Sequence, residues 1–258
     1  MQPVSVVIIC KNEAAVIGET LQSLHGVSDD IIVYDNGSTD DTVAVAKKYN
    51  VHVHHGNWEG FGKTKLKANS LAKYDWILSL DADERIDEEL KKSLLAFEPA
   101  NDKTVYDLRF KNFLGDKLLK HGEWGRDSHT RLFNRRVVQW NNEPVHETLM
   151  MPADITISRL KGFILHRTMN DIHEYAYKTA HYAMLGADKY YQQGKKAGWF
   201  KVRLSPGFNF LNYYILKLGF LDGHAGYICA KMTAHYTFLK YARLRELWNT
   251  RQGTKNSE

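Results

Sequence analysis

The run Val-Ser-Val-Val-Ile-Ile-Cys at residues 4–10 decides the fold that the sequence predicts. A short, continuous run rich in β-branched residues is typical of a strand that is buried on both faces. Residues 31–34, 51–54 and 76–80 repeat this character, and helical patterns lie between them. The order is therefore strand, helix, strand, helix, which predicts an α/β protein with a mostly parallel sheet flanked by helices.

The second half of the sequence loses this alternation. Shorter strand-like runs follow at residues 105–110, 130–133 and 155–157, and from Asp171 onward apolar residues recur at helical spacing. We expect a ligand-binding half of one domain, an acceptor-side half of the same domain, and a helical, basic extension. The predicted ranges are residues 1–97, 98–170 and 171–258.

Composition favours a folded protein without a membrane span. Of 258 residues, 43% are hydrophobic, which is enough for a sizeable core. The two cysteines, Cys10 and Cys229, lack the spacing of a zinc site or a redox pair and are expected in or near the core. No basic leader precedes the first strand, and the apolar stretch at residues 208–221 is too short to cross a bilayer. We expect a cytoplasmic protein.

The basic charge is concentrated near the end of the chain. Residues 195–258 contain eleven Lys and Arg against three Asp and Glu. This excess, with interleaved aromatic residues, predicts an anionic partner, either lipid head groups or nucleic acid. An anionic membrane surface, bound peripherally, is the partner we expect, although Ile228, Met232, Lys240 and Arg243 do not form a clean amphipathic stripe.

The sharpest chemical signal is Asp81-Ala82-Asp83-Glu84, directly after the apolar run at residues 76–80. Two carboxylates at a strand end can hold a hard divalent cation through oxygen atoms, and such a cation can bridge a diphosphate. The alternative is an ordinary acidic turn that leads into a helix near Asp87.

A second polar loop, Asp35-Asn36-Gly37-Ser38-Thr39-Asp40, follows the strand at residues 31–34. Asp35 at the strand tip could accept hydrogen bonds from a base or ribose, and Gly37 permits close approach. The same letters also form a good turn and helix cap, so Asp40 could be purely structural.

These motifs, with Val6-Val7-Ile8-Ile9-Cys10-Lys11-Asn12-Glu13, resemble the family 2 glycosyltransferases of GT-A fold in both order and separation. The resemblance implies a Rossmann-like domain that uses a nucleotide-sugar donor, with UDP-sugar expected, and a divalent cation, Mn²⁺ or Mg²⁺. It implies Asp35 near the base, Asp81 toward the ribose or phosphate, and Asp83 as the metal ligand. Further expected donor-site residues are Asn12, Glu13, His166 and, for the diphosphate, Lys63 or Lys65. Either lysine could equally be a solvated surface residue.

The second half is similar to bacterial lipopolysaccharide inner-core β-1,4-glucosyltransferases. The similarity is carried by Gly122-Glu123-Trp124, Arg131-Leu132-Phe133, Val145-His146-Glu147, His166 and Gly219-Phe220-Leu221-Asp222-Gly223. It implies an inverting transfer of glucose from UDP-glucose to a lipopolysaccharide core or other glycan acceptor. Trp124 and His146 are the expected acceptor-binding residues, although Trp124 beside a glycine could equally anchor its loop in the core.

An inverting transfer needs one general base for the acceptor hydroxyl. Glu147, in an irregular loop beyond the donor motifs, is the candidate, and Asp127 is the reserve. Glu147 could instead be a surface carboxylate paired with Arg131 or Arg135. His166 could touch the metal or diphosphate from a strand end, or be a hydrogen-bonded structural histidine.

Three other functions would use some of the same sequence features. A sugar-nucleotide pyrophosphorylase would need a glycine-rich loop after the first strand, where this sequence has Lys11-Asn12-Glu13. A basic nucleic-acid-binding protein would leave the carboxylates at the strand ends unexplained, so no nucleic acid is expected. A polyprenyl-phosphate or protein glycosyltransferase of the same fold stays open, because neither sugar nor acceptor can be read from the sequence.

Overall fold

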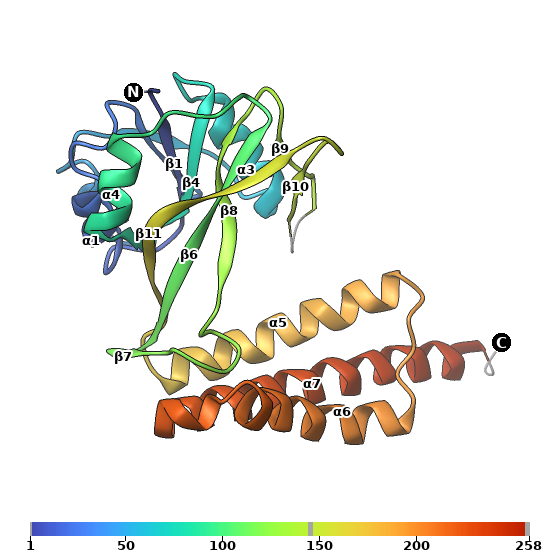
Figure 1. Ribbon diagram of the computed structural model, residues 1–258. Coiled ribbons are helices and arrows are strands. Elements are labelled where there is room, and N and C mark those ends of the chain that lie inside the picture. Colours follow the sequence, from blue (N-terminus) through green and yellow to red (C-terminus); the bar gives the residue numbers. More distant parts are fainter. Residues whose placement is uncertain (1, 144–146, 256–258) are drawn as a thin grey trace. The chain divides into compact units, whose positions relative to one another are not determined.

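The computed structural model describes residues 2–143 and 147–255, and the chain divides into two compact units. Unit 1 comprises residues 1–110 and 128–166, and unit 2 comprises residues 111–127 and 167–258. Figure 1 shows the α/β architecture of unit 1 and the long helices of unit 2. The α/β class and the helical C-terminal extension are confirmed.

In unit 1 the sheet begins with four parallel strands in the order β3-β2-β1-β4. β8 pairs antiparallel with both β4 and β6, and β5 pairs antiparallel with β11. Among the described residues the sheet has nine strands. The parallel strands and their neighbours are β1 (Ser5–Cys10), β2 (Ile31–Asp35), β3 (His52–His55), β4 (Trp76–Asp81), β5 (Glu84–Ile86), β6 (Thr104–Leu114), β7 (Lys117–Leu118), β8 (Ser128–Asn134) and β11 (Thr156–Met169).

Strand β1 lies at the centre of the parallel part and is buried along its whole length. Its alternate side chains belong to two different apolar clusters: Val6 and Ile8 to one, Val7 and Ile9 to the other. This confirms the prediction of a strand covered on both faces. Successive residues of a strand point to opposite faces, so both faces here carry hydrophobic layers.

Helices from both sides supply those layers. Apolar residues of α1, α2 and α4 pack in the first cluster, whereas α3 and the hairpin β9–β10 contribute to the second. Asp87 accepts a hydrogen bond from the backbone of Leu90 at 2.9 Å and so caps α4. The elements are α1 (Ile17–Ser23), α2 (Thr42–Ala46), α3 (Phe61–Ser70), α4 (Glu88–Leu95), β9 (Gln139–Trp140) and β10 (Leu149–Met150).

Unit 2 is built around a long pair of helices. α5 buries Ala183, Gly186 and Ala187 against α7, and a Cβ on Gly186 would lie only 2.9 Å from the hydroxyl of Tyr236. A small residue there lets the two helices approach closely. The helical elements are α5 (Ile172–Gln192), α6 (Trp199–Leu211), the π-helical turn η1 (Asn212–Leu216), the 3₁₀ turn η2 (Gly219–Asp222) and α7 (Gly223–Lys255). No helix of the described chain is long and apolar enough to span a bilayer.

Both cysteines are buried, Cys10 in unit 1 and Cys229 in unit 2, as expected. Burial raises the pKa of each thiol to about 12. Thiols of that kind stay protonated at neutral pH and are poor nucleophiles, so they act as small core side chains.

Candidate active site

The carboxyl ends of β1, β2 and β4 meet at one edge of the sheet of unit 1. The strand register places Cys10 opposite Asp35 and Ile9 opposite Asp81. The two aspartates therefore flank the end of β1 on either side. Ligands of α/β proteins bind at this edge, beyond the carboxyl ends of parallel strands.

Asp35, the last residue of β2, is 2% exposed and accepts hydrogen bonds from the loop that follows it. The backbone N–H groups of Gly37 and Ser38 donate to its carboxylate at 3.2 Å, and Nδ1 of His55 lies 3.3 Å from Oδ2. Burial opposes ionisation, but these hydrogen bonds outweigh it and lower the pKa of Asp35. The carboxylate stays charged and holds the loop at the strand tip.

The loop after β1 is hydrogen-bonded to the loop after β2. Asn12 has a φ of 59°, its N–H donates to Ser38 Oγ at 2.9 Å, and its Oδ1 accepts from the Thr39 N–H at 2.8 Å. The N–H of Glu13 donates to Thr42 Oγ1 at 2.7 Å. Asn12 and Glu13 thus form one wall of the site together with the loop of Asp35.

Asp40 has the structural role that was considered for it. Its Oδ2 accepts from the N–H of Ala14 at 3.1 Å, and its Oδ1 accepts from the N–H of Thr42 at 3.0 Å. These bonds lower the pKa of Asp40, with the Thr42 hydroxyl as the largest cause. The carboxylate is occupied in joining the two loops.

Arg131, on β8, is the central cation of the site. Its Nη2 donates to Asp81 Oδ2 at 3.0 Å and also to Glu84 Oε1, and Glu84 Oε2 accepts from the N–H of Asp81 at 3.0 Å. Burial raises the pKa of Glu84 to about 7 although Arg131 opposes the rise. Burial also acts on Asp81, but Lys65 and Arg131 outweigh it and lower the Asp81 pKa. Arg131 thereby holds the strand end that carries Asp81.

This role of Arg131 is absent from the sequence prediction, in which Arg131 is part of the Arg131-Leu132-Phe133 motif and a possible partner of Glu147. A signal was available: Arg131 precedes Leu132 and Phe133 in an apolar strand. An arginine in a buried strand needs an anionic partner, because an unpaired buried charge is strongly unfavourable. Which carboxylates it would meet depends on the pairing of β8 with β4, which is a long-range feature.

The two candidate lysines of α3 differ sharply. Lys65 is 3% exposed, and its Nζ lies 2.7 Å from Glu147 Oε1, 3.4 Å from Asp81 Oδ1 and 4.7 Å from the centre of the Trp140 ring. Lys63 is exposed two residues earlier in the helix. The structure thus brings Lys65 into the carboxylate cluster and leaves Lys63 at the surface.

Glu147 lies in this cluster and not beside Arg135, whose Nε lies 3.7 Å from an oxygen of Asp75 instead. The preceding loop is pinned to α3, because the Gly62 N–H donates to the Glu143 carbonyl at 3.1 Å. A Cβ on Gly62 would lie 2.0 Å from the Asn141 carbonyl oxygen, so only glycine permits this approach. His146 lies outside the described residues.

Asp83 and His166 form a separate pair at the same edge. β11 pairs with β5 so that His166 lies opposite Glu84, and His166 Nε2 is 3.3 Å from Asp83 Oδ2. Burial opposes protonation of His166, but the carboxylate of Asp83 outweighs it and raises the His166 pKa. His166 lies within β11, whereas the sequence indicated a strand end. The strand continues because the Met169 carbonyl accepts from the Gly115 N–H at 2.8 Å.

Asp83 and His166 supply one oxygen and one nitrogen donor that could hold a divalent cation together with oxygen atoms of a diphosphate. Among the described residues no group of three or more His, Cys, Asp or Glu could hold a metal ion. A site with few protein ligands and several phosphate oxygens is the usual arrangement for Mg²⁺.

The remaining two candidates belong to unit 2. Asp127 Oδ2 accepts from Asn112 Nδ2 at 3.2 Å. Trp124 packs against the apolar cluster that includes Leu119 and Tyr175, and its carbonyl accepts from the same Asn112 side chain. Stacking of Trp124 on an acceptor sugar and a basic role for Asp127 therefore stay predictions.

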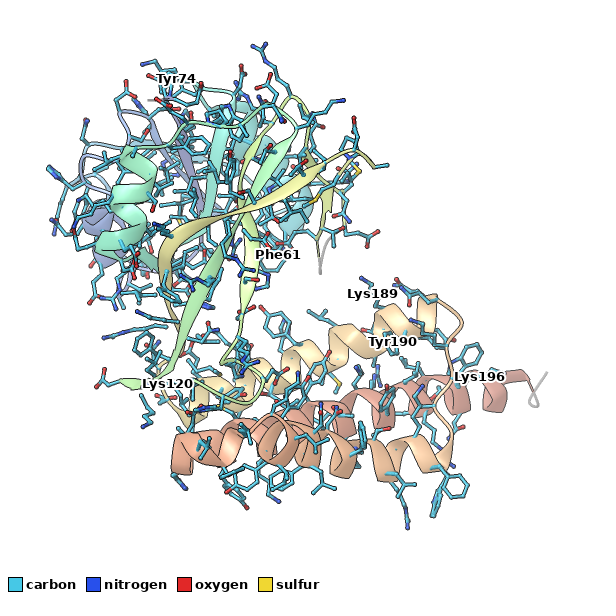
Figure 2. The ribbon with its side chains drawn as sticks, in the orientation of Figure 1. Phe61, Tyr74, Lys120, Lys189, Tyr190 and Lys196 are labelled. Atoms are coloured by element: carbon cyan, nitrogen blue, oxygen red, sulfur yellow. The ribbon has the colours of Figure 1, made fainter. Side chains whose placement is uncertain are left out.

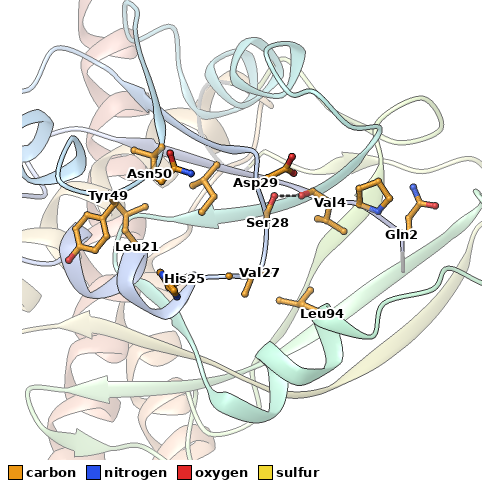
Figure 3. A pocket seen from close by; sticks show the side chains of 14 residues that line it. Gln2, Val4, Leu21, His25, Val27, Ser28, Asp29, Tyr49, Asn50 and Leu94 are labelled. Carbon is orange, nitrogen blue, oxygen red and sulfur yellow. Dashed lines mark hydrogen bonds between the residues drawn. The ribbon is translucent and has the colours of Figure 1, made fainter.

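A cavity of about 530 Å³ lies elsewhere in unit 1 (Figure 3). Its walls include Val4, Ile31 and Val51, which lie at or just before the amino ends of the first three strands, together with Leu21 and Leu94. Its lining is mainly apolar. It lies at the opposite ends of the strands from Asp35 and Asp81, and ligand sites of α/β folds lie beyond the carboxyl ends.

Carboxylates, a buried lysine and a histidine gathered beyond the carboxyl ends of parallel strands are the arrangement of an α/β enzyme that handles a charged substrate. The chain belongs to glycosyl transferase family 2, whose sequence model matches residues 5–152. It is a nucleotide-sugar-dependent glycosyltransferase.

Similar proteins of known sequence extend along nearly the whole chain. A glycosyltransferase of Rickettsia prowazekii is 29% identical, over 96% of this chain and 88% of its own. The lipopolysaccharide core biosynthesis glycosyltransferase LpsC of Rhizobium meliloti is 28% identical, over 94% of this chain and 92% of its own. Among solved structures, S. aureus TarS 1–349 in complex with UDP-GlcNAc is 16% identical, with 94% of this chain and 92% of that chain covered and a TM-score of 0.49.

Proposed function

We propose that the protein transfers a hexose, glucose from UDP-glucose, to a lipopolysaccharide core acceptor with inversion at the anomeric carbon. The observation that carries this proposal is the convergence of Asp81, Lys65 and Glu147 beside the Asp83–His166 pair at the carboxyl edge of the sheet. The name of the Rhizobium meliloti relative supports the choice of acceptor.

The donor would bind in residues 1–97. Asp35, whose pKa is lowered, offers a charged acceptor for N–H or O–H groups of the base, and Asn12 and Glu13 line the neighbouring wall. Asp81 reaches toward the ribose or phosphate. Lys65, between Asp81 and Glu147, supplies positive charge for the diphosphate, whereas the exposed Lys63 serves as a surface lysine.

Asp83 and His166 would hold a divalent cation, Mn²⁺ or Mg²⁺. Such a cation neutralises the charge that develops on a departing nucleoside diphosphate. His166, whose Nε2 now lies 3.3 Å from Asp83 Oδ2, would have to be deprotonated to act as a ligand. Arg131 keeps Asp81 and Glu84 in place behind this pair.

Transfer then needs one base. Glu147 accepts the proton of the acceptor hydroxyl, the acceptor oxygen forms a bond to the anomeric carbon, and the bond from that carbon to the diphosphate oxygen breaks on the opposite face. Lys65 now holds one oxygen of Glu147 at 2.7 Å, and a bound diphosphate would compete for the same ammonium. Donor binding would therefore release Glu147 for the acceptor.

A thermal-shift screen of nucleotide sugars tests the proposal. A ligand that binds only the folded state raises the melting temperature, by roughly 5–10 °C for a chain of this size at about 100 times Kd. UDP-glucose with Mn²⁺ or Mg²⁺ should give this rise, and ADP-glucose or UDP-glucose with excess chelator should give much less. The absence of a shift with every UDP-sugar in both metals would contradict a UDP-sugar donor.

A further inference from the structure

Helix α6 of unit 2 presents its apolar side to solvent. Its inner side packs on α7: Val202 belongs to the cluster around Leu244, and Asn209 Nδ2 donates to Thr237 Oγ1 at 2.7 Å. Figure 1 shows α6 lying along α7. The outer side carries large apolar residues at a spacing of three or four, and η1 continues the row. These exposed residues are Phe200, Leu204, Phe208, Leu211 and Ile215.

The exposed row is too large for an ordinary soluble surface. Phe200 is 69% exposed, and Leu204 and Phe208 are each 64% exposed. Leu216, Leu218, Phe220 and Leu221 in η1, η2 and the turn between them extend the exposed apolar area. Contiguous patches of this kind mark interaction sites, whereas single exposed leucines need no explanation.

The charge of residues 195–221 indicates an anionic partner for this surface. Residues 195–221 contain five Lys or Arg and no Asp or Glu. Arg203 lies 4.5 Å from the centre of the Trp199 ring, and Lys217 lies 4.5 Å from that of Tyr213. Figure 2 labels Lys196 in the loop that joins α5 to α6, where its Nζ lies 5.0 Å from the centre of the Trp248 ring. Apolar rows flanked by cations and aromatic rings are typical of helices that lie in the interface of an anionic bilayer.

Two alternatives to binding on a membrane surface are disfavoured, one by charge and the other by length. A second copy that packed the same surface against itself would bring two segments that each carry five Lys or Arg and no Asp or Glu close together. A spanning orientation is excluded by length, since thirteen residues of helix extend only about 20 Å. The helix can lie in the plane of a membrane but cannot cross it.

We propose that α6, η1 and η2 form a membrane-docking surface that inserts Phe200, Leu204, Phe208, Leu211 and Ile215 into the head-group region of an anionic phospholipid bilayer. This goes beyond the peripheral membrane binding expected from the sequence by naming the residues that bind, and it relies on no step of sugar transfer. Lys201 and Arg203, adjacent to the row, would contact lipid phosphates.

Sedimentation with vesicles of phosphatidylcholine, with or without phosphatidylglycerol, tests the surface. The full chain should bind the anionic vesicles and be released by high salt. The double variant Leu204→Gln/Phe208→Gln should bind at least about tenfold more weakly, because two large apolar groups no longer leave water. The double variant Lys201→Glu/Arg203→Glu should bind anionic vesicles more weakly by a comparable factor at low salt. High salt should reduce this difference from the parent chain.

Matched controls come from unit 1. Ile157 is 58% exposed, and Lys47 and Lys48 are exposed, so Ile157→Gln and Lys47→Glu/Lys48→Glu change the same properties elsewhere and should bind like the parent. Calorimetric UDP binding by each variant separates this test from the donor proposal. The surface assignment is overturned if the α6 variants keep full vesicle binding, if the controls lose as much, or if the row instead closes a dimer in sedimentation equilibrium.

Discussion

Replacing Asp83 by alanine is expected to abolish sugar transfer and the metal-dependent part of donor affinity while the protein stays folded. Asp83 Oδ2 faces His166 Nε2 at 3.3 Å, and these two atoms are the proposed protein ligands of the cation. Without the carboxylate, the charge of the departing diphosphate would be poorly neutralised. The expected loss of transfer exceeds roughly 10³-fold, the upper range for removal of one transition-state stabilising group.

Folding should tolerate this change. Asp83 is not part of either apolar cluster of unit 1, and it contributes to a crowded group of carboxylates with Asp81 and Glu84. Circular dichroism melts and calorimetric titration of UDP with and without Mn²⁺ measure both halves of the prediction. Glu89→Ala, which removes an exposed carboxylate from nearby α4, is the control and should leave both unchanged. Turnover by Asp83→Ala, or full activity of the parent in excess chelator, would refute the metal-bridged mechanism.

The second large effect is expected for Glu147→Gln, which should slow transfer by about 10²–10⁴, the usual contribution of a positioned general base. The amide has the shape of the carboxylate, and its oxygen can still accept from Lys65. Donor binding should therefore change little while the turnover number falls. Steady-state kinetics with a truncated lipopolysaccharide core acceptor would separate the two quantities.

Glu143→Gln is the matched control, because Glu143 is exposed in the same loop and contributes its backbone carbonyl, not its side chain, to Gly62. It should turn over at the parent rate. If Glu147→Gln did so as well, the basic role would pass to Asp127, and Asp127→Asn should then show the loss.

The parallel part of the fold follows from local patterns. Each early strand is a short apolar run that ends in a polar loop, so the sequence predicts both the strands and the edge at which their carboxyl ends meet. Asp35 and Asp81 lie at that edge because β2 and β4 flank β1. Their placement depends only on the order of parallel strands, which the alternation with helices strongly restricts.

Other features of the site depend on contacts between distant segments. Lys63 and Lys65 could not be ranked from sequence, because which side of α3 faces the sheet is decided by packing against β9 and the loop at Asn141. Arg131 meets Asp81 through the antiparallel pairing of β8 with β4. His166 reaches Asp83 through the pairing of β11 with β5. No local pattern determines these pairings.

The exposed row on α6 could not be predicted from the sequence either, for a different reason. Residues 208–221 are apolar in the sequence, and an apolar helical segment is normally expected to face a core. The structure instead turns the side of α6 that includes Asn209 toward α7 and exposes Phe208 and Leu211. Only the packing of α6 on α7 reveals which residues are left in solvent. The sequence predicted a basic tail with an anionic partner but not the helix that would bind it.

The proposed cation site at Asp83 and His166 is tested most directly by electron paramagnetic resonance of Mn²⁺ titrated with the protein, with and without UDP. Because Asp83 and His166 would provide only two ligands, we expect weak binding of Mn²⁺ alone and binding of one ion per chain at least about tenfold tighter when UDP is present. Equally tight binding of Mn²⁺ without UDP, or no binding of Mn²⁺ in the presence of saturating UDP, would contradict a cation held jointly by this pair and a nucleoside diphosphate.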